Sequence, residues 1–235
     1  MPSALVTGSA KGIGKAILLA LAQQGYDVTV HYQQSQKEAH EVAELASSFG
    51  VKTLCLQADV TKPKEAQALV QKTYEHFGRL DVLVNNVGNY HHGSLDSHSV
   101  ETWLEMFDSN LHSTFYTCQA AVALMRLKGG RIVNIGYAGA EHLIARPGIA
   151  AYSIAKTGVI LYSKALAKTE IKNNITVNVV SPGVIENSLT QPVAEIPIGR
   201  PGKLDELVSA VLYFLSPDAS YVTGVTLEVA GGWNI

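Results

Sequence analysis

The sequence predicts an α/β fold in which one parallel sheet of seven strands carries helices on both faces. Apolar segments of strand length alternate with periodic segments of helix length along the whole chain. The strand segments are apolar at nearly every position, as in a sheet that is covered on both faces. A glycine-rich turn directly follows the first of them. We therefore expect a single domain over residues 1–235.

The apolar segments expected to form strands are residues 3–6, 27–32, 52–56, 81–84, 130–135, 175–181 and 224–229. The segments between them repeat apolar residues at the helical period. The expected helices cover residues 12–24, 36–49, 64–77, 100–126, 149–172 and 204–215. The stretch 186–202 has weak periodicity and is expected to be a substrate loop, because long loops in compact domains often bind ligands.

Composition excludes several classes of protein. Apolar residues make up 47% of the chain and charged residues 16%, and the net charge is −2, which excludes a disordered chain and a strongly basic nucleic-acid binder. No apolar run approaches the roughly 20 residues of a membrane span. The first residues lack a charged leader, and Cys55 and Cys118 are isolated, so a cytoplasmic protein is expected. The low charge content favours an oligomer.

Gly8, Gly12 and Gly14 form a G-x-x-x-G-x-G turn between the first strand and the first helix. Glycine allows a tight turn and a close approach to a pyrophosphate, which the helix N-terminus then binds. Such turns also serve as plain connectors. The position of this one in the first βα unit is what favours dinucleotide binding.

The end of the second strand indicates which dinucleotide binds. An acid there would bind the ribose 2′-hydroxyl of NAD. Residues 31–35 contain no acid, whereas Lys11 and Ser35 could both meet a 2′-phosphate. We therefore expect NADP(H). The alternative is that Lys11 is a solvated loop lysine.

Several motifs follow one another in order along the chain. They are Thr7-Gly8-x-x-x-Gly12-x-Gly14, Asp59-Val60, Asn85-Asn86-Val87-Gly88, Asn110, Tyr152-x-x-x-Lys156, Pro182-Gly183, Thr223-Gly224 and Gly231-Gly232. With these motifs the whole chain resembles the short-chain dehydrogenase/reductase family, and most of all its 3-oxoacyl-acyl-carrier-protein reductases. The segment around His31 and Tyr32 also resembles pteridine reductases. The resemblance implies a Rossmann-type doubly wound sheet and a homotetramer or homodimer.

The resemblance also implies which residues hold the cofactor, with Asp59 beside the adenine and Pro182 beside the nicotinamide. The expected cofactor-binding residues are Gly8, Lys11, Gly12, Ile13, Gly14, Tyr32, Ser35, Asp59, Val60, Asn86, Gly88, Tyr152, Lys156, Pro182, Gly183 and Ile185. Asn187 and Ser188 stand where the family often has threonine, which puts one contact to the carboxamide in doubt.

Tyr152 and Lys156 stand four residues apart on an expected helix, so they share one face. A free tyrosine has a pKa near 10, and a nearby ammonium together with a positive nicotinamide ring would lower that pKa. The tyrosine can then exchange a proton with a carbonyl or alcohol oxygen as hydride moves. On an unrelated helix the pair would be an ordinary surface feature. The resemblance implies that Asn110 holds a water linked to Lys156.

The serine that the family places after the fifth strand is missing. Counting forward from the strand puts Tyr137 at its position, and counting back from Tyr152 puts Gly139 there. Loss of one donor to the carbonyl can cost on the order of 10²–10³ in rate. Tyr137 is a candidate catalytic replacement through its phenol. The equal alternative is a packing residue that narrows the pocket.

His91 and His92 follow the Asn-Asn-Val-Gly turn, and they either contact substrate or lie on the surface. No histidine or cysteine has metal-ligand spacing, so no metal is expected. The favoured function is an NADP(H)-dependent oxidoreductase acting on a small carbonyl compound or an acyl thioester. The alternatives are a pteridine-reductase-like enzyme and a weakly active cofactor-binding protein. No nucleic-acid or membrane partner is expected.

Overall fold

The structure is a computed structural model of the chain and describes residues 1–188 and 190–233. Its strands form one seven-stranded sheet in the order β3-β2-β1-β4-β5-β6-β7, with every neighbouring pair parallel. The strands are β1 (Ser3–Val6), β2 (Asp27–Tyr32), β3 (Thr53–Gln57), β4 (Val82–Asn85), β5 (Gly130–Ile135), β6 (Ile175–Pro182) and β7 (Thr226–Val229). The strand order reverses beside β1, so the sheet is doubly wound and the expected fold class is confirmed.

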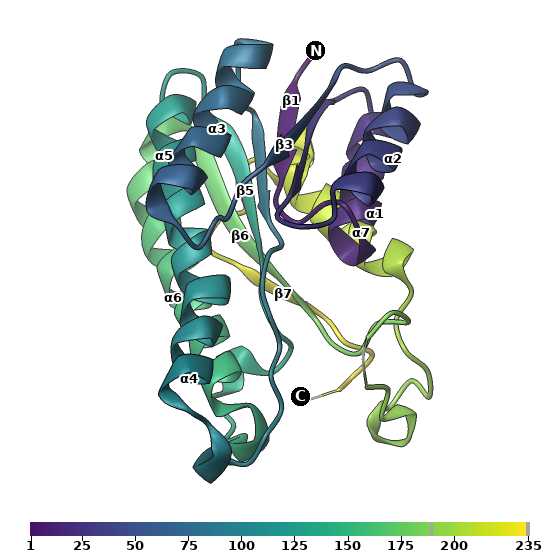
Figure 1. Ribbon diagram of the computed structural model, residues 1–235, viewed down its shortest axis with the longest axis vertical. Helices are drawn as coiled ribbons and strands as arrows, with labels where there is room; N and C mark the ends of the chain where they lie inside the picture. Colours follow the sequence, from purple (N-terminus) through teal and green to yellow (C-terminus); the bar gives the residue numbers. More distant parts are fainter. Residues whose placement is uncertain (189, 234–235) are drawn as a thin grey trace.

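Two layers of helices cover the sheet. They are α1 (Gly12–Gln23), α2 (Gln36–Ser47), α3 (Pro63–Phe77), α4 (Val100–Phe107), α5 (Ser113–Met125), α6 (Ala150–Glu170) and α7 (Leu204–Leu215). Figure 1 shows α1, α2 and α7 on one side of the sheet and α3, α5 and α6 on the other. No helix in the described part of the chain has both the length and the apolar character needed to cross a bilayer.

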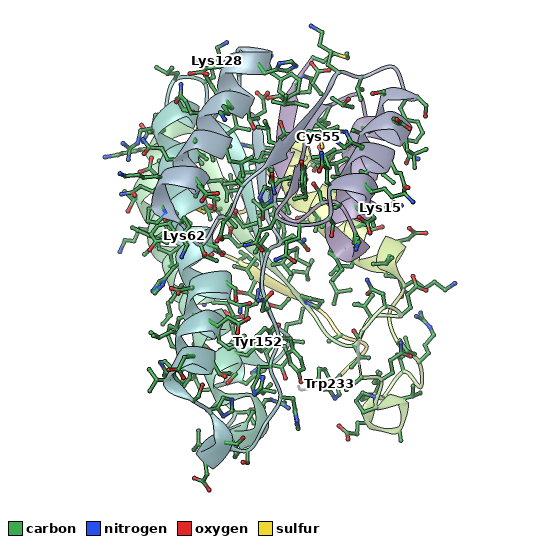
Figure 2. All side chains as sticks on the ribbon, in the orientation of Figure 1. Lys15, Cys55, Lys62, Lys128, Tyr152 and Trp233 are labelled. Atoms are coloured by element: carbon green, nitrogen blue, oxygen red, sulfur yellow. The ribbon has the colours of Figure 1, made fainter. Side chains whose placement is uncertain are left out.

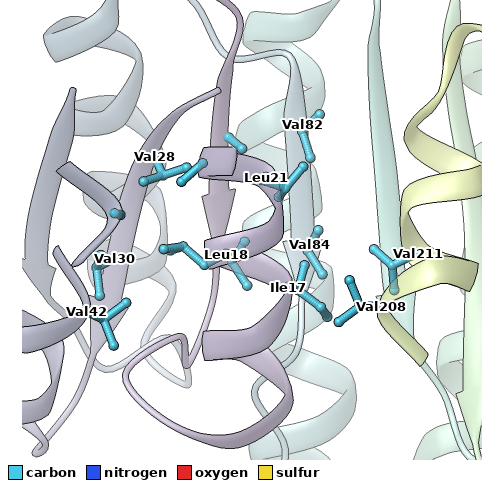
Figure 3. Close-up of a cluster of buried hydrophobic side chains, with 14 of the residues drawn as sticks. Ile17, Leu18, Leu21, Val28, Val30, Val42, Val82, Val84, Val208 and Val211 are labelled. Atoms are coloured by element: carbon cyan, nitrogen blue, oxygen red, sulfur yellow. The ribbon is translucent and has the colours of Figure 1, made fainter. Parts of the chain in front are cut away.

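Alternate strand residues face opposite layers, which explains why the strands are apolar throughout. Ala4 and Val6 of β1 belong to the core cluster under α1, α2 and α7, whereas Leu5 between them belongs to the cluster under α3, α5 and α6. Figure 3 shows the first cluster, with Ile17, Leu18, Leu21, Val28, Val30, Val42, Val82, Val84, Val208 and Val211 labelled.

The predicted element boundaries are confirmed to within two residues, with one difference in kind. The sequence predicts a single helix over residues 100–126, but the structure has α4 and α5 joined by a π-helical turn, Asp108–His112. A π turn adds one residue to the local hydrogen-bonded ring and often marks a functional site. This turn contains Asn110, which belongs to the candidate catalytic residues.

The functional end of the sheet lies where the parallel strands reach their carboxyl ends, beside the reversal of strand order. The connections after β4, β5 and β6 meet there, at the lower end of the molecule in Figure 1. In the stretch 186–202 the described residues form a short 3₁₀ turn, Val193–Glu195, and an isolated bridge pairs Ile185 with Gly202 at its base. The described residues of this stretch form a loop, and its expected role in binding substrate stays a prediction.

Candidate active site

The glycine turn between β1 and α1 has the backbone of a phosphate cradle. Gly8 and Gly12 have φ angles of 63° and 55°, in the region that favours glycine. A β-carbon on Gly14 would lie only 2.5 Å from the carbonyl oxygen of Gly8. Lys11, at the N-cap of α1, makes no side-chain capping bond, and the first turn of this helix contains no acid. The cradle therefore fits the pyrophosphate of a dinucleotide.

His31, near the end of β2, holds this turn in place. Its Nδ1 accepts a hydrogen bond from the Gly8 amide at 2.9 Å, and its Nε2 lies 3.1 Å from the Ala58 carbonyl oxygen, to which it donates. The ring is therefore neutral, with its proton on Nε2. Burial lowers the pKa of His31 to about 4, consistent with that assignment. The Ser9 hydroxyl also accepts from the His31 amide at 3.0 Å.

The side chains expected at a 2′-phosphate lie at the mouth of the same turn. Lys11 Nζ is 2.8 Å from Glu38 Oε1, in an ion pair with the first turn of α2. Ser35 occupies the N-cap position of α2 without a side-chain capping bond. Tyr32, in contrast, lies in the core cluster under α1, α2 and α7. Residues 31–35 contain no acid, but Glu38, one helical turn further on, brings a carboxylate to Lys11.

Asp59 and Val60 border a side cavity of about 450 Å³ together with Gly8 and His31. The Asp59 carboxylate accepts hydrogen bonds from the amide and hydroxyl of Thr61, at 3.0 and 2.6 Å. These bonds fix the carboxylate beside the glycine turn. The structure thus brings the residues expected at the adenine to the phosphate cradle.

Asn86 joins the end of β4 to the glycine turn, because its Nδ2 donates to the carbonyl oxygens of Thr7 and Gly8 at 3.0 and 3.2 Å. Gly88 follows two residues later. A β-carbon on Gly88 would collide with Asn110 Oδ1 and would lie 3.3 Å from Lys156 Nζ. Glycine at this position therefore allows Lys156 and Asn110 to approach each other.

Asn110 is fully buried in the π turn. Its Nδ2 donates to the carbonyl oxygens of Asn89 and Met106, both at 2.9 Å. Its Oδ1 has no hydrogen-bond partner among the described residues and faces Gly88. A buried acceptor at this point agrees with the expected water-holding role, which remains a prediction.

Tyr152 and Lys156 of α6 both line a central cavity of about 420 Å³. Lys156 Nζ donates to the Ile135 carbonyl oxygen at 2.7 Å and lies 5.9 Å from the centroid of the Tyr152 ring. Burial lowers the pKa of Lys156 to about 8. Burial also raises the pKa of Tyr152, and the phenols of Tyr137 and Tyr90 act in the same direction. The expected lowering of the Tyr152 pKa is therefore not found for the protein's own groups.

Tyr137, at the end of β5, borders the central cavity and is 8% exposed. Its ring centroid lies 5.4 Å from that of Tyr152, with the ring planes at 71°. Gly139, the other candidate for the serine position, has a φ of 87° and donates its amide to Glu228 Oε1 at 2.7 Å. Tyr137 rather than Gly139 is therefore the residue whose ring packs against Tyr152.

Pro182, Gly183 and Ile185 line the central cavity from the end of β6, as expected of residues beside a nicotinamide. Asn187 and Ser188 line it as well, and the Ser188 hydroxyl accepts a hydrogen bond from the Ile185 amide at 2.9 Å. Both residues that replace the family's threonine therefore lie at the central cavity.

An outer cavity adjoins the central one and shares with it Tyr90, Tyr137, Val184, Thr190 and Trp233. His92 lines the outer cavity. The ring of His91 instead packs edge to face against His98, with centroids 5.3 Å apart. Only His92 therefore lies at the candidate site. Among the described residues, no group of three or more His, Cys, Asp or Glu side chains is arranged to hold a metal ion.

Known proteins resemble this chain over nearly its full length. A family model described as Enoyl-(Acyl carrier protein) reductase matches residues 8–234, almost the whole chain. The chain belongs to the short-chain dehydrogenase/reductase family. The 3-oxoacyl-[acyl-carrier-protein] reductase FabG of Staphylococcus aureus is 36% identical to this chain. The match covers 98% of this chain and 97% of the relative. A 3-oxoacyl-[acyl-carrier-protein] reductase of Synechocystis is 38% identical over 97% and 95% of the two chains.

Solved structures resemble this short-chain dehydrogenase/reductase over nearly its full length. Acetoin dehydrogenase YohF from Salmonella typhimurium is 36% identical with a TM-score of 0.90, covering 99% of this chain and 95% of its own. A blue fluorescent protein from a metagenomic library, solved in complex with NADPH, is 31% identical with a TM-score of 0.94, covering 100% and 98%.

Three residues at the site of this short-chain dehydrogenase/reductase were missed from the sequence: Tyr90, Arg146 and Trp233. Tyr90 meets Tyr152 edge to face at 5.1 Å. The Arg146 guanidinium carbon lies 5.9 and 5.7 Å from the ring centroids of Tyr137 and Trp233. In the sequence, only position points to two of them: Tyr90 precedes His91, and Trp233 directly follows Gly231-Gly232. Arg146 has no such neighbour among the motifs.

Proposed function

We propose that the protein is an NADP(H)-dependent oxidoreductase that transfers hydride between the nicotinamide and a carbonyl or alcohol substrate. The observation that supports this most directly is the convergence of Tyr152 and Lys156 in one cavity, with Asn110 directly beyond Gly88. NADPH supplies the hydride when it is bound. The chain's own groups bind and orient the reactants and move the proton.

Tyr152 is the proton donor in this proposal. Because burial raises its pKa, the phenol stays protonated at neutral pH and can give its proton to the substrate oxygen during reduction. Lys156 stabilises negative charge that develops on the phenol after transfer. Asn110 Oδ1 accepts from a water that returns a proton through Lys156.

The proposed binding mode for NADP(H) uses the glycine cradle for the pyrophosphate and Asp59 with Val60 for the adenine. Lys11 and Ser35 meet the 2′-phosphate. Support comes from the uncapped start of α1 and from the lysine at its N-cap. The proposal requires the ammonium to be released from Glu38 when the phosphate arrives.

The substrate is proposed to be a small carbonyl compound, and the names of the relatives make a 3-oxoacyl thioester the first candidate. A second function is favoured by one observation. The serine hydroxyl is replaced by the phenol of Tyr137, which suits a cofactor-binding protein of weak activity if this phenol does not reach the carbonyl.

We place the protein in the cytoplasm, which the free thiols Cys55 and Cys118 support.

One set of measurements tests the proposal. Protein fluorescence is titrated with NADPH and NADH, and NADPH oxidation is followed with an acetoacetyl thioester, a dihydropterin and simple ketones. We expect tighter binding of NADPH and turnover of at least one carbonyl compound. Tyr152→Phe should lower the rate of carbonyl reduction about 10²–10⁴-fold and leave NADPH binding intact, because only the proton donor is lost. Tighter binding of NADH, or full activity of Tyr152→Phe, contradicts the proposal.

A further inference from the structure

Tyr137, Trp233 and Arg146 form one wall of the outer cavity, and Tyr137 and Trp233 also line the central cavity beside Tyr152. The rings of Tyr137 and Trp233 are perpendicular, at 85°, with centroids 6.2 Å apart. The Arg146 guanidinium lies within 6 Å of both centroids. Tyr137 follows β5, Trp233 lies in the turn after β7 and Arg146 lies in the loop before α6, so their meeting is a product of the fold. Figure 2 shows Trp233 near Tyr152 at the same end of the molecule.

Trp233 is held in the wall by a tightly constrained turn. Gly231 and Gly232 have φ angles of 61° and 85°, and the Gly231 carbonyl oxygen accepts from the Ile198 amide at 3.1 Å. A β-carbon on Gly232 would lie 3.1 Å from Pro197. The Trp233 amide donates to the Ala230 carbonyl oxygen at 3.0 Å. Pro197, Ile198 and the turn after β7 therefore hold the backbone of Trp233 in place.

The polar side chains around the wall restrict the charge of a ligand. The described residues that line the central and outer cavities include Lys156, Arg146 and His92 and no aspartate or glutamate. A cationic ligand would meet no carboxylate among these lining residues and would face the ammonium of Lys156. The lining therefore suits a neutral or anionic substrate, with flat aromatic and guanidinium surfaces at its side.

We infer that Trp233 and Tyr137 select a flat, ring-shaped carbonyl substrate over a flexible acyl chain. This inference rests on the proposed reductase function and narrows its substrate class. A planar, electron-poor ring gains stacking on these π faces in addition to the burial of its area. A flexible chain gains burial alone and loses rotamer freedom as it is ordered. Trp233 is thus a specificity-determining residue.

The first test measures binding without turnover, using isatin, a planar bicyclic ketone, as the probe. Saturating NADP⁺ is present, so no hydride is available. The variant Trp103→Phe leaves Trp233 as the sole tryptophan, and Trp233→Phe leaves Trp103 on α4. We expect isatin to quench the tryptophan emission of Trp103→Phe and not that of Trp233→Phe. The Trp233→Phe variant also serves to correct for the light that isatin absorbs. Equal or absent quenching overturns the inference.

The second test compares KM for isatin with KM for ethyl acetoacetate, a linear 3-oxo ester. Trp233→Leu should raise KM for isatin about tenfold, equal to ~1.4 kcal/mol, and change KM for the ester less than about twofold. Trp103→Leu is the matched control and should change neither. Equal effects of Trp233→Leu on both substrates overturn the inference. Selective quenching without reduction of any carbonyl supports the inference and overturns the proposed reductase function.

Discussion

At the scale of single residues, Tyr137 stands where the family places a serine, and its phenol is the proposed group that polarises a carbonyl oxygen. The Tyr137 ring meets Tyr152 edge to face and also belongs to the wall with Trp233. Its ring packing and its hydroxyl can therefore be separated by a variant that removes only the oxygen. Catalytic and packing roles lead to different rates for that variant.

We expect Tyr137→Phe to lower kcat/KM for carbonyl reduction at least about tenfold, equal to ~1.4 kcal/mol of transition-state stabilisation, if the phenol donates to the developing oxyanion. Steady-state kinetics with saturating NADPH measure this. Tyr116→Phe, a tyrosine of α5, is the control. An unchanged rate would show that Tyr137 only packs, with Tyr152 as the only donor.

Glu38 is the second residue whose role is testable in isolation. It holds Lys11 in an ion pair and so competes with a 2′-phosphate for the same ammonium. We expect Glu38→Gln to tighten NADPH binding about two- to fivefold and to leave NADH binding unchanged, a modest effect typical of an exposed pair. Fluorescence titration measures both constants.

Glu41→Gln is the matched control for Glu38→Gln. Glu41 lies on the same helix, and its carboxylate is 4.0 Å from Lys37 rather than from Lys11. Weaker NADPH binding in Glu38→Gln, or an equal gain in Glu41→Gln, would contradict the assigned role of Lys11.

At the scale of elements, His31 ties β2 to the glycine turn only while its ring is neutral. Its pKa is about 4 in the folded protein and 6.5 for the unperturbed group, so between these values the unfolded chain binds more protons. The free energy of unfolding therefore falls as the pH drops from 6.5 towards 4. The loss is about 2 kcal/mol by pH 5 and levels off below pH 4.

His31→Asn should remove this pH-dependent part, so the stability gap between wild type and variant should narrow from pH 7.5 to pH 5. Urea unfolding at fixed protein concentration measures the gap. His40→Asn, at an exposed position of α2, should leave the wild-type pH dependence in place. A gap that is constant across this pH range would contradict the burial of a neutral His31.

The helices and strands were predictable because the helical and strand periods of apolar residues, and the glycines between elements, are local features of the sequence. β1 to β7 follow the apolar segments, and each helix boundary other than the two beside the π turn lies within two residues of its expected place. The π turn was not predictable, since it adds a residue without changing the apolar pattern of residues 100–126. The sequence motifs likewise predicted that residues such as Gly88, Tyr152 and Lys156 lie together, and these residues line the central cavity. Trp233 and Arg146 were not, because their role comes from the meeting of two distant loops.

At the scale of the whole molecule, two separate surfaces carry exposed apolar side chains. One, on α4, α5 and α6, includes Leu104, Phe115 and Leu161, which are 52%, 38% and 64% exposed. The other, near α7 and β7, includes Tyr213 and Val225, at 47% and 43%. Two self-complementary twofold surfaces generate a tetramer, which is the assembly we propose.

Sedimentation velocity should therefore show a species of about 100 kDa, four copies of the 25.1 kDa chain. Leu161→Glu should convert it to a dimer, because a buried unpaired carboxylate at one twofold contact is costly. Leu127→Glu, between α5 and β5, is the control and should leave the tetramer intact. A 25 kDa wild-type species at micromolar concentration would exclude the assembly.

The final turn has a practical consequence for handling the protein. Trp233 lines the central and outer cavities, and only two residues follow it in the sequence, so a peptide fused after Ile235 is tethered close to the proposed substrate site. The amino terminus lies at the opposite end of the sheet (Figure 1). Affinity tags and reporter fusions therefore belong before Met1. A carboxyl-terminal fusion should slow substrate entry while leaving the glycine cradle unaltered, and protease removal of the fusion should restore turnover.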